Sequence, residues 1–312
     1  MKVLFLGTPE FAAITLSALL ASRHRVVGVV AQPSKPSGRG LAVADPPSVR
    51  VAREAGLPVL QPSRLLAPET HETFRALGAD LFITAAYGRI LRRVVLDIPP
   101  LGCWNVHGSL LPRHRGASPV AASILSGDDW TGVTIFRMDE GMDTGPILSE
   151  AMIQLTPRET TGELMLRLAR LGGELLVTTL DRCERGDLSP IPQPEDGATY
   201  AGMLEKGDGL LRFGLPVEQA DRWVRAMTPW PGAFAWIGEQ RLRIHRARPL
   251  DRIERPAEAG TLVSHPLGIA VVCRPGLLLL EEVQAEGRRQ QPALEWLRGA
   301  RLAPGSRFVT HP

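Results

Sequence analysis

The chain has 312 residues, of which 44% are hydrophobic and 22% charged, and its formal net charge is +3. This is the composition of a globular protein with enough length for two domains, and no run of 18 apolar residues predicts a membrane span. The three cysteines are odd in number and far apart, which argues against a disulfide framework or a cysteine metal site and favours a reducing compartment. We therefore expect a cytoplasmic protein, or one in an organelle matrix if a leader has been removed.

The first half of the chain alternates strand and helix patterns. The opening strand, residues 2–7, has too short an apolar run for a signal peptide. Thr8, Pro9 and Glu10 then predict a helix start, with Thr8 as the capping residue. Further strands are expected at residues 25–32, 57–61, 80–87, 102–109 and 131–139, and helices at residues 46–56, 68–78 and 119–127. This alternation predicts an α/β fold, a Rossmann-like parallel sheet with helices on both faces.

The second half of the chain begins with a capping box, Thr160-Thr161-Gly162-Glu163, that opens a helix running toward Cys183. Residues 186–202 then hold three prolines and three glycines with little periodicity, which is typical of a linker. After one more helix, short strands are expected at residues 233–237, 241–247, 260–265, 268–273 and 276–284. Their spacing predicts a small, OB-like β-barrel. The expected division is a first domain at 1–187, a linker at 188–205 and a barrel domain at 206–312.

Charge is unevenly distributed between the two halves. Residues 1–204 hold 20 Lys and Arg against 21 Asp and Glu, whereas residues 205–312 hold 16 against 12. The net charges are thus −1 and +4, and an anionic partner such as nucleic acid is expected at the second half. The alternative is a solvated basic face. The first strand–turn–helix unit lacks the G-x-G-x-x-G fingerprint, so a nicotinamide dehydrogenase is not expected.

Asn105 and His107 lie at the end of an expected strand, in the stretch "WNVHGSLLP". Residues two apart in a strand point to the same side, so both can face one pocket at the carboxyl end of the sheet, where ligands bind in open α/β folds. The alternative is a structural histidine. A later acidic, glycine-rich loop, "FRMDEGMDTGPI", is expected to bring a carboxylate to the histidine, and spacing alone does not choose among Asp139, Glu140 and Asp143.

The run "NVHGSLLPRHRG", followed about thirty residues later by "MDEGMDTGPIL", resembles the folate-dependent formyltransferases. The resemblance implies a catalytic trio of Asn105, His107 and Asp143, with 10-formyltetrahydrofolate as formyl donor and no metal. It also implies a folate site that includes Ser109, Leu110, Leu111 and Pro112. The stretch "AAYGRIL" is similar to the pterin-pocket strand end of that family, which would add Tyr87, Gly88, Arg89, Ile90 and Leu91.

Two further stretches resemble the branch of this family that formylates methionyl initiator tRNA. "AQPSKPSGRG" is similar to its tRNA-acceptor loop, which implies tRNA contacts by Lys35 and Arg39, and "MTPWPGAFAW" is similar to the start of its carboxyl-terminal domain. The protein is expected to act as a monomer. Two departures are that "LAVADPP" replaces the lysines usual after this loop, and that Gly108 replaces an alanine.

The same trio would also serve a glycinamide ribonucleotide formyltransferase, a formyltetrahydrofolate hydrolase or a sugar-nucleotide formyltransferase. The first two normally lack the carboxyl-terminal domain, and the loop with Lys35 and Arg39 argues against the third. A non-catalytic tRNA-binding protein with a decayed formyltransferase core is the alternative from another class, and the intact trio argues against it.

Overall fold

The computed structural model describes residues 1–34, 36–37, 42–250, 257–300, 302 and 305–309. The chain forms two compact units. The first comprises Met1–Pro119, Trp130–Gln154 and Leu164–Gly202, and the second comprises Val120–Asp129, Leu155–Glu163 and Met203–Pro312. The segment expected as a linker, residues 188–205, thus contributes to the first unit as far as Gly202. No helix in the described part of the chain has the length and apolar character needed to cross a membrane.

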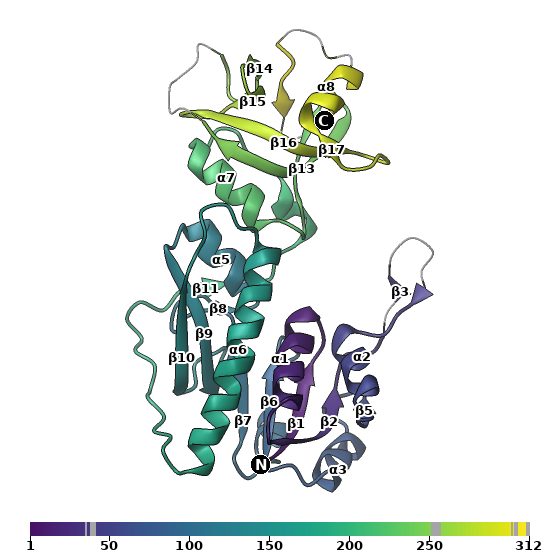
Figure 1. Ribbon diagram of the computed structural model, residues 1–312, viewed down its shortest axis with the longest axis vertical. Helices are drawn as coiled ribbons and strands as arrows, with labels where there is room; N and C mark the ends of the chain where they lie inside the picture. Colours follow the sequence, from purple (N-terminus) through teal and green to yellow (C-terminus); the bar gives the residue numbers. More distant parts are fainter. Residues whose placement is uncertain (35, 38–41, 251–256, 301, 303–304, 310–312) are drawn as a thin grey trace. The chain divides into compact units, whose positions relative to one another are not determined.

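The first unit is built on a seven-stranded sheet (Figure 1). Its strands, in spatial order, are β10 (Ile147–Gln154), β9 (Trp130–Arg137), β7 (Cys103–His107), β6 (Leu81–Ala85), β1 (Lys2–Gly7), β2 (Arg25–Val30) and β5 (Val59–Leu60). The five strands from β5 to β7 are parallel, which confirms the expected α/β class. β9 and β10 are antiparallel additions to the β7 edge, so the sheet is mixed. Two short pairs, β3 (Pro36–Ser37) with β4 (Ala42–Val43) and β8 (Arg115–Gly116) with β11 (Tyr200–Ala201), complete the strands of this unit.

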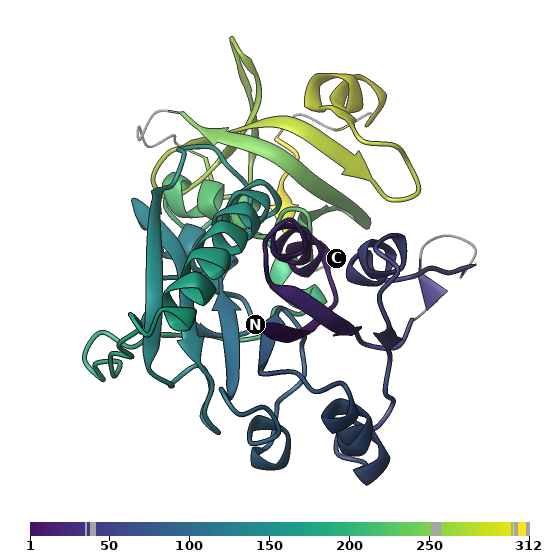
Figure 2. The ribbon, with the colours of Figure 1, turned by 60° about the horizontal axis from the view of Figure 1, so that its bottom comes forward.

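Helices cover both faces of this sheet (Figure 2). They are α1 (Glu10–Leu20), α2 (Pro47–Glu54), α3 (Pro68–Ala76), α4 (Arg93–Leu96) and α6 (Thr161–Glu184). Gly172 of α6 leaves room for Val106 of β7 on one face, because a Cβ at Gly172 would lie 2.8 Å from a Val106 methyl carbon. On the other face, Phe74 of α3 and Val95 of α4 are buried in one cluster with Phe82 of β6. Apolar burial on both faces explains why the inner strands have continuous hydrophobic sequences.

Of two helix starts predicted from local sequence patterns, the structure confirms one and corrects the other. The capping box before α6 is confirmed, because the Thr160 N–H donates to Glu163 Oε2 (2.8 Å) and the Glu163 N–H donates to Thr160 Oγ1 (3.3 Å). The expected cap by Thr8 is wrong: α1 follows Pro9 without a side-chain cap. Thr8 Oγ1 instead accepts the N–H of Gln32 (3.1 Å), since the ends of β1 and β2 lie side by side.

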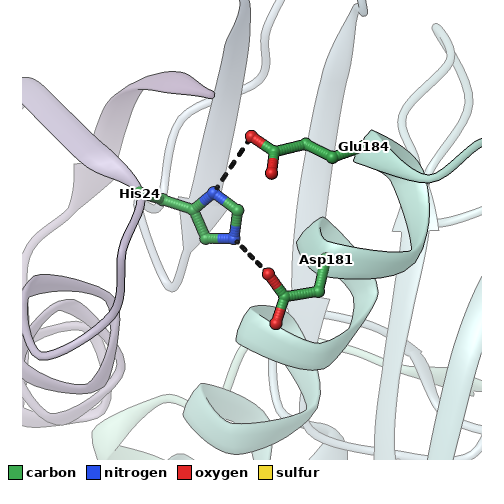
Figure 3. A group of neighbouring side chains, drawn as sticks. All are labelled: His24, Asp181 and Glu184. Atoms are coloured by element: carbon green, nitrogen blue, oxygen red, sulfur yellow. Dashed lines mark ion pairs between the residues drawn. The ribbon is translucent and has the colours of Figure 1, made fainter.

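An ion-pair cluster ties the start of β2 to the end of α6 (Figure 3). His24 is 5% exposed, and its ring nitrogens lie 3.3 Å from Asp181 and 3.6 Å from Glu184. Arg23 pairs with both carboxylates at 2.7 Å, and the amino group of Met1 also pairs with Glu184. Arg23 and the Met1 amino group therefore balance the charge of the two carboxylates, and exposed ion pairs of this kind each contribute little to stability.

The second unit contains an antiparallel sheet in the order β14 (Leu262–His265), β15 (Gly268–Val272), β16 (Leu277–Ala285), β13 (Gln240–Pro249), β12 (Ala233–Ile237) and β18 (Phe308–Val309). A bridge between Thr261 and Arg307 joins the two ends of this order, which closes the expected barrel. The other elements are α5 (Pro119–Ser126), the 3₁₀ turn Lys206–Gly209, α7 (Val217–Ala226), β17 (Gln291–Pro292) and α8 (Ala293–Ala300). The helix α8 and the strand β10 of the first unit were not expected from the sequence.

Candidate active site

Adjacent strands of the first unit present Thr84 and Asn105 at the carboxyl end of the sheet. The two residues are register partners on β6 and β7. Since Val106 faces α6, Asn105 and His107 both point to the opposite face. The Thr84 hydroxyl donates to Asn105 Oδ1 at 2.6 Å, which fixes the orientation of the amide. Asn105 Nδ2 has no hydrogen-bond partner among the described residues, so its N–H groups are available to a ligand.

His107 is 4% exposed and has its ring held from two sides. Nε2 lies 3.0 Å from the carbonyl oxygen of His114, and because a carbonyl only accepts, Nε2 carries a proton. Nδ1 lies 3.7 Å from Asp143 Oδ2, beyond hydrogen-bond length but close enough for charge attraction. The ring of Phe136 packs edge-on at a centroid distance of 6.3 Å. The Nδ1 side is therefore the one that can exchange a proton.

The connection between β9 and β10 places one of its three acids beside the histidine. Asp143 adopts a φ of +54°, and its Oδ2 accepts the N–H of Gly116 at 2.7 Å. Asp139 Oδ1 instead accepts the Gly141 N–H (3.0 Å) and the Thr144 hydroxyl (2.7 Å), so it organises the loop. The third acid, Glu140, is exposed.

Sequence reasoning missed Gln193, which holds this loop in place. Its Nε2 donates to the carbonyl oxygens of Asp143 (2.8 Å) and Gly145 (2.7 Å). Its Oε1 accepts from Nε (3.1 Å) and Nη2 (2.9 Å) of Arg115, which is 1% exposed. The segment that carries Gln193 returns along the sheet, pairing Ile191 with Ile147 (Figure 1). No pattern in the sequence links residues this far apart, so only the structure places Gln193 at the site.

The expected pterin segment, residues 87–91, directly follows β6. Tyr87 and Leu91 are 3% and 2% exposed and belong to the core of the first unit, whereas Ile90 is 68% exposed. The Tyr87 hydroxyl is buried without a partner in the described residues, and burial raises its pKa. Gly88 has a φ of +74°, and Arg89 Nη1 donates to the Ser63 carbonyl (3.1 Å).

Gln32 reaches this segment from the end of β2. Its Nε2 donates to the Tyr87 carbonyl oxygen at 2.8 Å, a contact that the sequence did not suggest. The backbone at the end of β6 is thereby held by a side chain from another strand end.

Burial raises the pKa of the Cys103 thiol, at the start of β7, to about 12, so this cysteine is an inert core residue.

The Ser-Leu-Leu-Pro segment directly follows β7. The Ser109 hydroxyl donates to the Arg113 carbonyl (2.6 Å), and the Leu111 N–H donates to Thr134 Oγ1 (3.1 Å). Leu111 is 5% exposed, while Leu110 and Pro112 are half-buried. Because β6 and β7 are parallel neighbours, this segment and residues 87–91 both leave the sheet at the carboxyl ends of its strands.

Lys35 and Arg39, the expected tRNA contacts, lie outside the described residues.

The family model "Formyl transferase" matches residues 1–180, and "Formyl transferase, C-terminal domain" matches residues 203–301. A methionyl-tRNA formyltransferase of Symbiobacterium thermophilum is 46% identical over 310 residues, covering 99% of this chain and 95% of the relative. The chain belongs to the methionyl-tRNA formyltransferase family. A second member, from Myxococcus xanthus, is 45% identical and covers 98% of this chain and 97% of its own length. The resemblance seen in the sequence is thereby confirmed.

Two solved structures share the fold. An N-formyltransferase from Helicobacter canadensis, in complex with folinic acid and dTDP-3-aminofucose, has a TM-score of 0.67 at 14% identity. That comparison covers 93% of this chain and 100% of the other. HypX from Aquifex aeolicus, in complex with tetrahydrofolic acid, has a TM-score of 0.64 at 18% identity and covers 95% of this chain and 47% of its own. At these identities the likeness establishes the fold alone.

Proposed function

We propose that this protein transfers the formyl group of 10-formyltetrahydrofolate to the α-amino group of the methionine on initiator tRNA, for translation initiation. The names of its relatives, at 46% and 45% identity over nearly the whole chain, support this activity. The observation that carries it is the convergence of an available Asn105 amide, the His107 ring and the Asp143 carboxylate at one strand end. We place the protein in the cytoplasm and regard it as a monomer.

Asn105 stabilises the charge that develops on the formyl oxygen. When the α-amine attacks the formyl carbon, a new C–N bond forms and the carbonyl oxygen becomes an oxyanion. Asn105 Nδ2 donates to that oxygen, and its orientation is set in advance because Thr84 holds Oδ1. A fixed donor does not have to reorganise during the reaction. Loss of one such donor typically lowers turnover by about 10²–10³-fold.

His107 supplies a second donor in its cationic form. Nε2–H is engaged by the His114 carbonyl, so the additional proton sits on Nδ1, the side that faces Asp143. From there His107 donates a charge-assisted hydrogen bond to the oxyanion, and the Asp143 carboxylate provides the counter-charge. Asp143 also positions a water that carries a proton from the attacking amine to the folate nitrogen as the old C–N bond breaks.

The proposal also assigns the two domains, the folate contacts and the tRNA contacts. The catalytic domain comprises residues 1–187, and Gln193 from the segment that follows it holds the active-site loop. Residues 87–91 and 109–112 supply the folate contacts. The Asn105 amide, held by Thr84, suits a polar co-substrate at the carboxyl end of the sheet. Residues 206–312 form the tRNA-binding domain after a linker at 188–205, in keeping with the basic charge excess there. Lys35 and Arg39 contact the acceptor stem.

The experiment offers labelled 10-formyltetrahydrofolate together with one of four acceptors: initiator methionyl-tRNA, elongator methionyl-tRNA, glycinamide ribonucleotide or an amino-sugar nucleotide. Label should enter only the methionyl ester, and initiator tRNA should be a better substrate than elongator methionyl-tRNA. Transfer to either small acceptor, with none to tRNA, would overturn the proposal.

A further inference from the structure

One exposed apolar side chain lies directly beside the candidate catalytic carboxylate. Met142 precedes Asp143 in the loop between β9 and β10 and is 59% exposed. Its sulfur lies over Gly116, since a Cβ added to Gly116 would be 3.4 Å from it. The Asp143 carboxylate accepts the N–H of the same Gly116. The thioether and the carboxylate therefore meet at one residue of β8.

The turn that carries Met142 is fixed on both sides. Before Met142, the Asp139 carboxylate accepts the Gly141 N–H. After it, Gln193 binds the carbonyl oxygens of Asp143 and Gly145. Gly145 is packed so closely that an added Cβ would lie 1.8 Å from the Arg137 carbonyl oxygen. Met142 is thus exposed on a turn whose backbone is fixed by hydrogen bonds on both sides, so its side chain stays beside Asp143.

Exposure alone does not select Met142. Single exposed apolar residues are common on protein surfaces. Met152, on the edge strand β10 opposite Gly132 of β9, is also 59% exposed. What distinguishes Met142 is its position next to Asp143 and over Gly116. The two methionines therefore form a natural pair of test site and control.

We propose that Met142 is a specificity-determining residue that contacts the methionyl side chain of the aminoacyl acceptor. This inference rests on the proposed function. The attacking α-amine must reach the groups of Asn105, His107 and Asp143, and only a few covalent bonds separate that amine from the substrate's thioether. A polarizable, unbranched side chain such as methionine suits contact with a second thioether, because it adapts its shape and attracts by dispersion.

The test compares initiator tRNA acylated with methionine or with glutamine, whose side chain has similar length but ends in an amide. In the wild-type enzyme, kcat/KM should favour the methionyl substrate. Met142→Ala should reduce that preference about tenfold, through a higher KM for the methionyl substrate. Met142→Leu should keep most of it. Met152→Ala should match the wild type.

An unchanged methionine-to-glutamine preference in Met142→Ala would overturn the inference while leaving the proposed function intact. An equal loss of preference in Met152→Ala would also overturn it, because the effect would not depend on the loop. If the wild-type enzyme formylates neither acylated tRNA, the proposed function fails and this inference fails with it.

Discussion

Gln193 holds the active-site loop and also accepts hydrogen bonds from the buried Arg115, so its substitution tests both contacts. In Gln193→Ala, two amide donors to the Asp143 and Gly145 carbonyls are lost, and Arg115, which is 1% exposed, loses the acceptor of two guanidinium N–H groups. At about 1 kcal/mol for each of the two neutral bonds, and about 1.5–3 kcal/mol for the charged interaction in which both Arg115 N–H groups share one oxygen, the free energy of unfolding should fall by about 3.5–5 kcal/mol. Turnover should fall at least tenfold, because small displacements of catalytic groups are costly.

The two tasks can be separated with Gln193→Glu. A carboxylate keeps an acceptor for Arg115 but turns oxygen atoms toward the two loop carbonyls. This variant should recover much of the stability in a urea titration and little of the turnover in a formyl-transfer assay. Wild-type stability and turnover in Gln193→Ala, or recovery of both in Gln193→Glu, would contradict this role of Gln193.

Three other perturbations address the Asn105 amide, the buried His24 and the second unit. Thr84→Val should lower turnover about tenfold by freeing the Asn105 amide, and Thr84→Ser should restore it; equal turnover in both variants would argue against the contact. Burial lowers the pKa of His24, so the folded protein binds fewer protons than the unfolded chain, and stability should fall as pH drops below about 6.5. Urea titrations at pH 7.5 and 5.5 should show a smaller loss for His24→Gln, and identical losses would contradict this. Deleting residues 206–312 should weaken tRNA binding far more than folate binding; tRNA affinity of the full chain that does not change with salt would contradict a phosphate-binding role.

Much of the first unit was accessible from the sequence because its signals are local. The capping box at Thr160 acts within one helical turn, and the parallel strands are continuous apolar runs. Asn105 and His107 were singled out because strand alternation alone puts them on one face. The choice of Asp143 over Asp139 at the sequence level depended on family resemblance, since three acids in one loop have equivalent spacing.

What the sequence did not reveal depends on contacts between distant segments. Gln193 lies in a proline-rich stretch that has the composition of a linker, yet it is hydrogen-bonded to a loop about fifty residues earlier. β10 was missed because Ser149, Glu150 and Gln154 interrupt its apolar residues and its pattern alternates weakly after the buried Leu148. Its residues become a strand by pairing with β9. Thr8 has the character of a helix cap, but a tertiary contact with Gln32 takes its hydroxyl oxygen.

Asp143, with Asn105 and His107, forms the proposed reaction centre. The most direct measurement is the turnover of Asp143→Ala beside Asp139→Ala in formyl transfer to initiator methionyl-tRNA, with tetrahydrofolate affinity determined for both. Asp143→Ala should lose at least about 10²-fold in turnover while still binding folate, and Asp139→Ala, which disturbs only the turn, should lose less. A larger loss of turnover in Asp139→Ala than in Asp143→Ala would contradict the assignment.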